Sequence, residues 1–144
     1  MTGKARDAVA SVKIAASREA IWSALTTPEE IKKYFLGTQV KTTWEVGSPI
    51  YFSGEWHGKP YEDHGVVLVF EPPEILRVSH YSPLSGKPDV PENYHTVEYR
   101  INDGDNNTSS VTITQGNNTS EEEAAESEKT WRLVLDSLKE LLEA

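Results

Sequence analysis

The sequence predicts an α+β domain in which a curved antiparallel sheet of six to seven strands wraps around a long C-terminal helix, with two short helices after the first strand. Three observations predict this fold. Apolar and polar residues alternate through most of residues 39–115, two short helical segments precede this region, and a long amphipathic segment ends the chain. The 144 residues suit one domain, which we place at residues 8–143 after a flexible N-terminus at residues 1–7.

The N-terminal region predicts one strand and two helices. Residues 12–14 alternate between apolar and polar, as in a short half-buried strand. Ser17 is suited to cap a following helix. Thr27 and Pro28 are typical of the start of a second helix, in which Glu30 is placed to complete a capping box. Gly37 is placed to end it.

The strongest helix signal lies at the end of the chain. Ser120 is followed by three glutamates, which is typical of a capped helix start where acidic groups face the positive end of the helix dipole. Apolar residues, Trp131 among them, then recur at three- and four-residue steps. A helix over residues 121–143 is about 35 Å long at 1.5 Å per residue, so it needs an equally broad partner surface.

The middle of the chain supplies that surface as a meander of strands. Alternating segments separated by Gly, Pro and Ser turns predict six further strands, at residues 39–46, 50–56, 63–70, 75–81, 94–102 and 110–115. Short connections favour antiparallel pairing. A broad sheet twists and curls, and a sheet curled around one helix tends to leave a cavity between them.

A few polar residues interrupt the side of the sheet predicted to face the helix. His80, His95 and Gln115 continue inward-facing apolar series, and His64 joins them only if its strand has the same phase. Buried polar groups need a partner, a water or a ligand. These residues are therefore interpreted either as polar anchors in an apolar pocket or as half-exposed groups satisfied locally at strand ends. Their spacing is not that of a metal site, and we expect no metal.

Composition excludes several classes of function. Acidic residues outnumber basic ones by 23 to 14, giving a formal charge of −9, and such a surface repels nucleic acid. No apolar run approaches the roughly 20 residues of a membrane helix, so we expect no membrane insertion. Cysteine is absent, which excludes disulfides and thiolate chemistry and fits a cytoplasmic protein.

Enzyme signatures are missing from the chain. The sequence has no nucleophile elbow, phosphate-binding glycine loop or dinucleotide fingerprint, so we expect no cofactor and assign no catalytic residue. Carboxylates within the strands, at Glu55, Glu62, Asp63 and Glu98, are interpreted as solvated groups on a strand surface.

Several motifs together resemble one protein family. Residues 20–31 read AIWSALTTPEEI and are followed by Tyr34 and Phe35, residues 44–49 read WEVGSP, residues 70–73 read FEPP, and Trp131 begins a terminal WxxxLxxL pattern. These motifs resemble the activator of 90-kDa heat-shock protein ATPase homologue branch of the START-like, birch-pollen-allergen-like (SRPBCC) superfamily. The resemblance covers nearly the whole chain and implies a helix-grip fold with a ligand cavity between the long helix and the sheet. It implies no particular ligand.

We therefore predict that the chain binds a small apolar or amphipathic molecule in this cavity. Two histidines, His80 and His95, are expected to orient a polar group of the ligand. The predicted ligand-binding residues are Phe52, Trp56, Leu76, Val78, His80, His95, Val97, Tyr99, Val111, Ile113, Trp131, Leu135 and Leu138.

Two other functions remain open from the sequence. One is a protein-interaction module, related to the heat-shock chaperone activators and to stress response, in which the acidic helix face or the loop at residues 82–92 contacts a chaperone. The other is a cyclase-like enzyme that uses His80 or His95 as a general base.

Overall fold

Seven antiparallel strands form the sheet of the computed structural model, which describes residues 6–35, 37–56 and 58–144, without the side chain of Trp56. The strand order is β1-β7-β6-β5-β4-β3-β2. This topology confirms the predicted sheet. The strands are β1 (Ala8–Ile14), β2 (Gln39–Lys41), β3 (Pro49–Trp56), β4 (Lys59–Glu71), β5 (Ile75–His80), β6 (His95–Asp103) and β7 (Ser109–Gly116).

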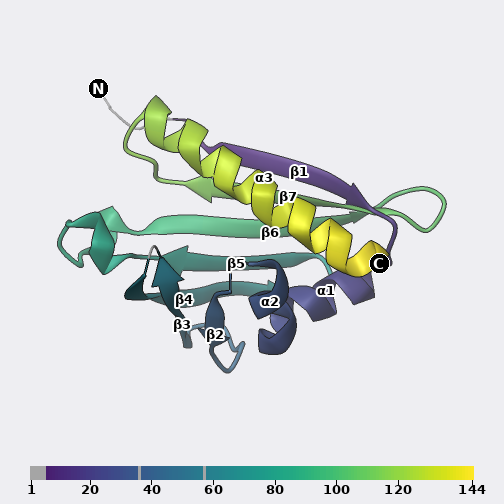
Figure 1. Ribbon diagram of the computed structural model, residues 1–144, viewed down its shortest axis with the longest axis horizontal. Helices are drawn as coiled ribbons and strands as arrows, with labels where there is room; N and C mark the ends of the chain where they lie inside the picture. Colours follow the sequence, from purple (N-terminus) through teal and green to yellow (C-terminus); the bar gives the residue numbers. More distant parts are fainter. Residues whose placement is uncertain (1–5, 36, 57) are drawn as a thin grey trace.

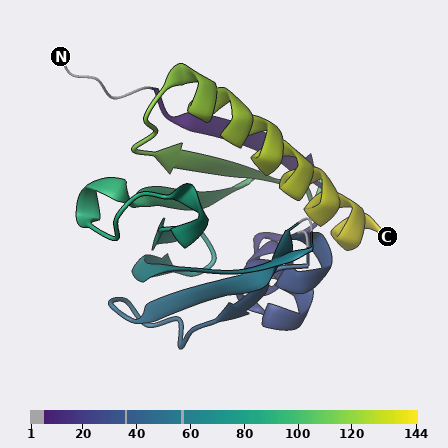
Figure 2. The same cartoon turned by 60° about the vertical axis from the view of Figure 1, so that its left-hand side comes forward.

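Three helices cover one face of this sheet (Figure 1). The long helix α3 (Glu121–Glu143) crosses in front of β1, β7 and β6, while α1 (Arg18–Thr26) and α2 (Pro28–Tyr34) cover the face near β4 and β3. Figure 2 shows from the side that α3 runs beside β1 and β7, whereas β3 and β4 curve away from it. The arrangement is the predicted α+β helix-grip architecture. No helix in the described ranges combines the length and apolar character needed to span a membrane.

The helix starts follow the sequence signals with one exception. The Ser17 hydroxyl accepts a hydrogen bond from Ala20 N, and the Ser120 hydroxyl accepts one from Glu123 N, as expected for N-caps. The predicted capping box at Thr27 is wrong, because the Thr27 side chain makes no capping bond. Thr27 is both the C-cap of α1 and the N-cap of α2, and only its carbonyl oxygen accepts hydrogen bonds from α2.

Three strand boundaries also differ by more than one residue from those predicted. Strand β1 starts at Ala8, ahead of the predicted alternation at residues 12–14. Strand β2 ends at Lys41 rather than at residue 46, and Trp44 adopts the left-handed conformation with φ of 66°, which turns the chain out of the sheet. Strand β4 starts at Lys59, four residues earlier than predicted, directly after Gly58 with φ of 80°. A bulge between Val67 and Val69 interrupts the pairing of β4 with β5, so one alternation pattern does not describe the whole strand.

The C-terminal half of α3 packs on the hydrophobic core. Leu135 and Leu138 are fully buried there against residues of β1 and β7, including Ile14, Val111 and Ile113. Burial of each such side chain contributes about 1.5–3 kcal/mol. This packing fixes α3 on the sheet and so positions its N-terminal half.

Strands β4 and β5 approach unusually closely at Gly65. A Cβ atom at this position would lie 1.8 Å from the Ser79 carbonyl oxygen, so no residue with a side chain fits without separating the strands. The Ser79 hydroxyl accepts a hydrogen bond from Val66 N across the same gap. This contact sets the position of the end of β5, which carries Val78 and His80.

The start of the described chain is tied to α3. The Arg6 guanidinium pairs with Glu121 at 2.8 Å and with Glu128 at 2.6 Å. The predicted flexible N-terminus covers residues 1–7, of which 1–5 lie outside the described residues.

Candidate ligand-binding cavity

A cavity of about 390 Å³ lies between the N-terminal half of α3 and the sheet. Its wall is built from β3 to β7, the first half of α3, the segment between α2 and β2, and the short turn η1 (Pro83–Ser85). Leu84, Glu126 and Thr130 line the cavity and are also exposed, so they mark its mouth.

Six of the predicted ligand-binding residues line this cavity. They come from three strands and from α3, and alternation along each strand turned them inward as expected. They are Phe52, Val78, His80, Val97, Tyr99 and Trp131.

Five other predicted residues lie in the solid core and not on the cavity wall. They face inward as alternation predicted, but the space around them is filled by other side chains. We therefore remove them from the candidate set, and they are Leu76, Val111, Ile113, Leu135 and Leu138. The prediction for Trp56 concerns a side chain outside the described part of the structure.

His95 and His64 do not reach the cavity wall. The ring of His95 instead contacts Glu123 of α3, with Nε2 lying 3.2 Å from the carboxylate. Strand β4 has the phase that turns Val67 inward, so His64 faces the other way and lies 3.3 Å from Asp89. Of the predicted polar anchors, the structure brings only His80 and Gln115 to the wall.

Several lining residues escaped the sequence prediction. The set is Phe35, Thr38, Tyr61, Asp63, Ser82, Leu84, Glu126, Ser127 and Thr130. Most come from segments without alternation, namely the α2–β2 connection, the turn η1 and the polar edge of α3. The interpretation of Asp63 as a solvated carboxylate is wrong, because Asp63 pairs with Phe52 across β3 and β4 and shares its inward side.

Aromatic rings form much of the apolar wall. Trp131 contacts Phe35 and Tyr99 edge to face, with ring centroids 5.5 and 6.1 Å apart. Phe52 contacts the ring of His80 in the same way at 5.4 Å. Edge-to-face contacts of this kind are favourable beyond the burial of the rings, so they stabilise this part of the wall.

Gln115 satisfies the polar groups between β7 and α3. Its side-chain oxygen accepts a hydrogen bond from Trp131 Nε1 at 2.9 Å. Its amide nitrogen donates to Asn118 Oδ1 and to Ser127 Oγ at 2.9 and 2.8 Å. The sequence predicted that a buried Gln115 needs partners, and this network supplies them. It fixes the indole of Trp131 on the cavity wall.

Asp63 and His80 form a polar pair on the opposite, sheet side of the cavity. His80 Nε2 lies 2.9 Å from Asp63 Oδ2, and the two side chains are 30% and 13% exposed. The other carboxylate oxygen, Asp63 Oδ1, is buried and has no hydrogen-bond partner within the described residues. A buried acceptor without a donor is costly, so this atom is a site of unsatisfied hydrogen bonding.

Hydroxyl groups supply the remaining polarity of the wall. Tyr61 Oη and Thr38 Oγ1 are hydrogen-bonded at 2.8 Å, and Gly54 leaves room for the Tyr61 ring, because a Cβ there would lie 2.9 Å from its hydroxyl. Burial raises the pKa of Tyr99, which keeps its phenol neutral.

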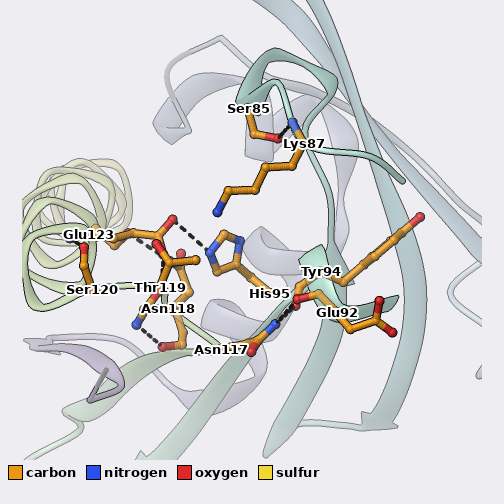
Figure 3. A network of polar contacts seen from close by, with 12 residues as sticks. Ser85, Lys87, Glu92, Tyr94, His95, Asn117, Asn118, Thr119, Ser120 and Glu123 are labelled. Carbon is orange, nitrogen blue, oxygen red and sulfur yellow. Dashed lines mark hydrogen bonds and ion pairs between the residues drawn. The ribbon is translucent and has the colours of Figure 1, made fainter. Parts of the chain in front are cut away.

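A network at the start of α3 joins the helix to β6 beside the cavity (Figure 3). The Glu123 carboxylate accepts hydrogen bonds from Thr119 N and Oγ1 with one oxygen and contacts His95 with the other. Lys87, from the loop after β5, extends toward the same place. Burial lowers the pKa of His95, against the opposing effect of Glu123, so we treat the contact as a hydrogen bond of a neutral imidazole.

The glutamate in this network titrates below its usual range. Burial works against ionisation of Glu123, but the bonds from Thr119 and His95 outweigh it and lower its pKa.

In the described part of the chain, no group of three or more His, Asp or Glu side chains is placed to hold a metal ion.

Comparison with protein families agrees with this architecture. The family described as activator of Hsp90 ATPase homolog 1-like protein matches residues 15–143. The chain belongs to this family. The activator-homologue family is part of the START-like (SRPBCC) superfamily, as the resemblance implied. No curated protein matches the chain significantly.

Solved structures of similar proteins share the fold of this activator-homologue domain. The solution structure of ChR145 from Cytophaga hutchinsonii is 44% identical, with a TM-score of 0.84, and the match covers 99% of this chain and 97% of that one. CalU16 from Micromonospora echinospora is 22% identical with a TM-score of 0.75 and 97% and 82% coverage. The Aha1 dimer from Colwellia psychrerythraea is 22% identical with a TM-score of 0.72 and 96% coverage of both chains.

Proposed function

We propose that this protein binds a small apolar or amphipathic molecule in the cavity between α3 and the sheet. The observation that carries the proposal is the cavity itself, about 390 Å³ in volume and walled by Phe52, Val78, Val97, Tyr99 and Trp131. This volume falls in the range of roughly 300–1,000 Å³ typical of small-molecule sites, which combine an apolar wall with a few polar groups. The polar groups here are the Asp63–His80 pair and the hydroxyls described above.

Amide-shift titration of labelled protein against a library of lipids and aromatic polyketide-like compounds tests this proposal. We expect the shifts to centre on cavity-lining residues. Mass spectrometry under native conditions tests whether a molecule of this class copurifies with the protein. Shifts confined to the outer face of the sheet would contradict the proposal.

A matched pair of variants locates the binding site. Val97 is buried on the cavity wall, so Val97→Phe places a ring in the cavity and is expected to abolish binding. Thr96→Phe adds the same ring to the neighbouring exposed position of β6 and serves as the control. Equal loss of affinity in both variants, or none in either, would argue against the cavity as the site.

The alternative of an acidic docking surface on α3 has less support. Two of the three carboxylates in the first turn of the helix, which were expected to contact a chaperone, have partners within the molecule. Glu121 and Glu128 pair with Arg6, and Glu123 bonds His95 and Thr119. Neutralising them would remove contacts that hold α3, so these groups have a structural role.

A further inference from the structure

Within the described residues, the carboxylates of the cavity wall face no lysine or arginine inside the cavity. Asp63 and Glu126 line the cavity, and no lining residue in the described ranges is Lys or Arg. Lys129 lies 3.6 Å from Glu126, but both side chains are more than two-thirds exposed on the outer surface of α3, at the mouth. A negative charge on a ligand therefore meets no lysine or arginine of the described chain inside the cavity, but it does meet the Asp63 carboxylate.

The Asp63–His80 pair presents hydrogen-bond acceptors. His80 Nε2 lies 2.9 Å from Asp63 Oδ2, and in the Nε2–H tautomer Nε2 donates to this carboxylate oxygen and Nδ1 is an acceptor. Asp63 Oδ1 is buried and has no hydrogen-bond partner within the described residues. The wall thus carries one buried acceptor without a donor, and the Nε2–H tautomer of His80 adds a second acceptor beside it.

The other polar groups of the wall do not supply the missing donor. The side chain of Gln115 is saturated, because its oxygen and both its N–H groups are used by Trp131, Asn118 and Ser127. Tyr61 and Thr38 bond each other. Within the described residues, no group of the wall donates a hydrogen bond to Asp63 Oδ1, which leaves this oxygen available to a donor on a ligand.

We propose that the Asp63–His80 pair selects ligands whose polar end is a hydrogen-bond donor, a hydroxyl or amino group on an apolar body, and excludes carboxylates. This inference rests on the proposed function and specifies its ligand class. A donor satisfies an acceptor that is otherwise unpaired in a poorly solvated place, whereas a carboxylate adds a second negative charge beside Asp63. The aromatic rings of Phe35, Phe52 and Trp131 suit a flat apolar body.

Three naphthalene probes of nearly equal size test the inference. 2-Naphthol carries the donor, 2-methoxynaphthalene replaces it by an ether, and 2-naphthoate is an anion at neutral pH. We expect 2-naphthol to bind the cavity at least about tenfold more tightly than either of the others, the usual effect of a hydrogen bond to a charged acceptor. Calorimetry measures the affinities, and amide shifts locate each probe.

Variants of two adjacent carboxylates separate a local from a general effect of charge. Asp63→Asn removes the charge beside the cavity and is expected to bring 2-naphthoate to within a few fold of 2-naphthol. Glu62→Gln makes the same change at the next residue, which is exposed, and is expected to leave the ranking of the probes as it is in the parent protein. Nitrogen-15 shifts of the His80 ring are expected to identify the Nε2–H tautomer, a measurement that needs no variant.

The outcomes distinguish this inference from the proposed function. Cavity shifts with equal affinity for 2-naphthol and its ether, tighter binding of 2-naphthoate, or an Nδ1–H tautomer of His80 would overturn the donor selection alone. Failure of all three probes and of the library to shift any cavity residue would overturn both.

Discussion

The C-terminal half of α3 presents Leu135 and Leu138 to the sheet, and the interior beneath it is solid. The N-terminal half of the same helix presents Ser127, Thr130 and Trp131 and borders the cavity. Protein interiors are close-packed where side chains are large enough to meet, so small polar residues on one half of a helix leave volume unfilled. We call the C-terminal half of α3 with the filled core beneath it the solid end, and the N-terminal half with the cavity beneath it the hollow end. The two can be tested separately.

The largest effect is expected at the solid end. Leu138 is fully buried, so Leu138→Ala should lower the free energy of unfolding by about 2–5 kcal/mol through lost contacts and a new void. Leu133→Ala, at a position 60% exposed on the same helix, should change it by no more than about 0.5 kcal/mol. Urea denaturation followed by circular dichroism measures both. Similar losses in the two variants would show that this end is not the packed one.

A smaller loss is expected when the polar network of the hollow end is broken. Gln115→Leu leaves Trp131 Nε1 and Asn118 Oδ1 without their partner, which should cost about 1–3 kcal/mol. Thr114→Val, on the opposite side of β7, is the control. Urea denaturation gives the stability, and tryptophan fluorescence reports the environment of Trp131. Unchanged fluorescence together with the stability of the control would contradict the role given to Gln115.

Most of the framework of both ends was predictable, because it depends on local patterns. The spacing of apolar residues and the cap at Ser120 defined α3, and alternation turned Val97 and Tyr99 inward. Alternation does not predict which part of the interior is filled by side chains and which part is a cavity. Leu135 and Ile113 have the same inward phase as the cavity residues, and only the placement of α3 over the sheet separates the two groups.

Of the Asp63–His80 pair, only the orientation of His80 was predictable from the sequence. His80 continued a clear inward series, whereas Asp63 lies in a strand that is apolar on both sides and contains a bulge, so its phase had no sequence signal. Its orientation follows from the register that places it opposite Phe52, which is a tertiary property. Likewise, Leu84 reaches the cavity mouth through the path of a loop.

The cap of α3 tests how firmly the hollow end is anchored. Ser120→Ala removes the acceptor of the Glu123 N–H and should lower stability by about 1 kcal/mol. Ser137→Ala, in the middle of the solid half, should be neutral or slightly stabilising, because alanine has the higher helix propensity. Thermal unfolding compares the two variants. A loss at Ser137 as large as that at Ser120 would remove the evidence for a specific cap.

The smallest effect is a dependence of stability on pH at the same end. Burial lowers the pKa of His95 in the folded protein, so the unfolded chain binds a proton more readily. Stability from this group is present above the ordinary histidine value near 6.5 and is lost as the pH falls through it. The lowered pKa of Glu123 acts in the same direction, but only below its ordinary value near 4.3.

His95→Gln isolates the histidine contribution. The amide can still donate to Glu123 but does not titrate, so the decline in stability between about pH 7 and pH 5 should be shallower than in the parent protein. Urea unfolding at a series of pH values measures this slope. An unchanged slope would assign the decline to other groups.

The close approach of β4 and β5 at Gly65 sets the distance between the Asp63 and His80 side chains. Where other residues carry a methyl group or more, this position has a single hydrogen atom, and the Ser79 carbonyl occupies the space that a side chain would need. Asp63 and His80 lie on the two strands that meet there, a few residues from the point of contact. Even an alanine at Gly65 would push the strands apart, so Gly65, which does not line the cavity, determines how far the His80 imidazole lies from the Asp63 carboxylate.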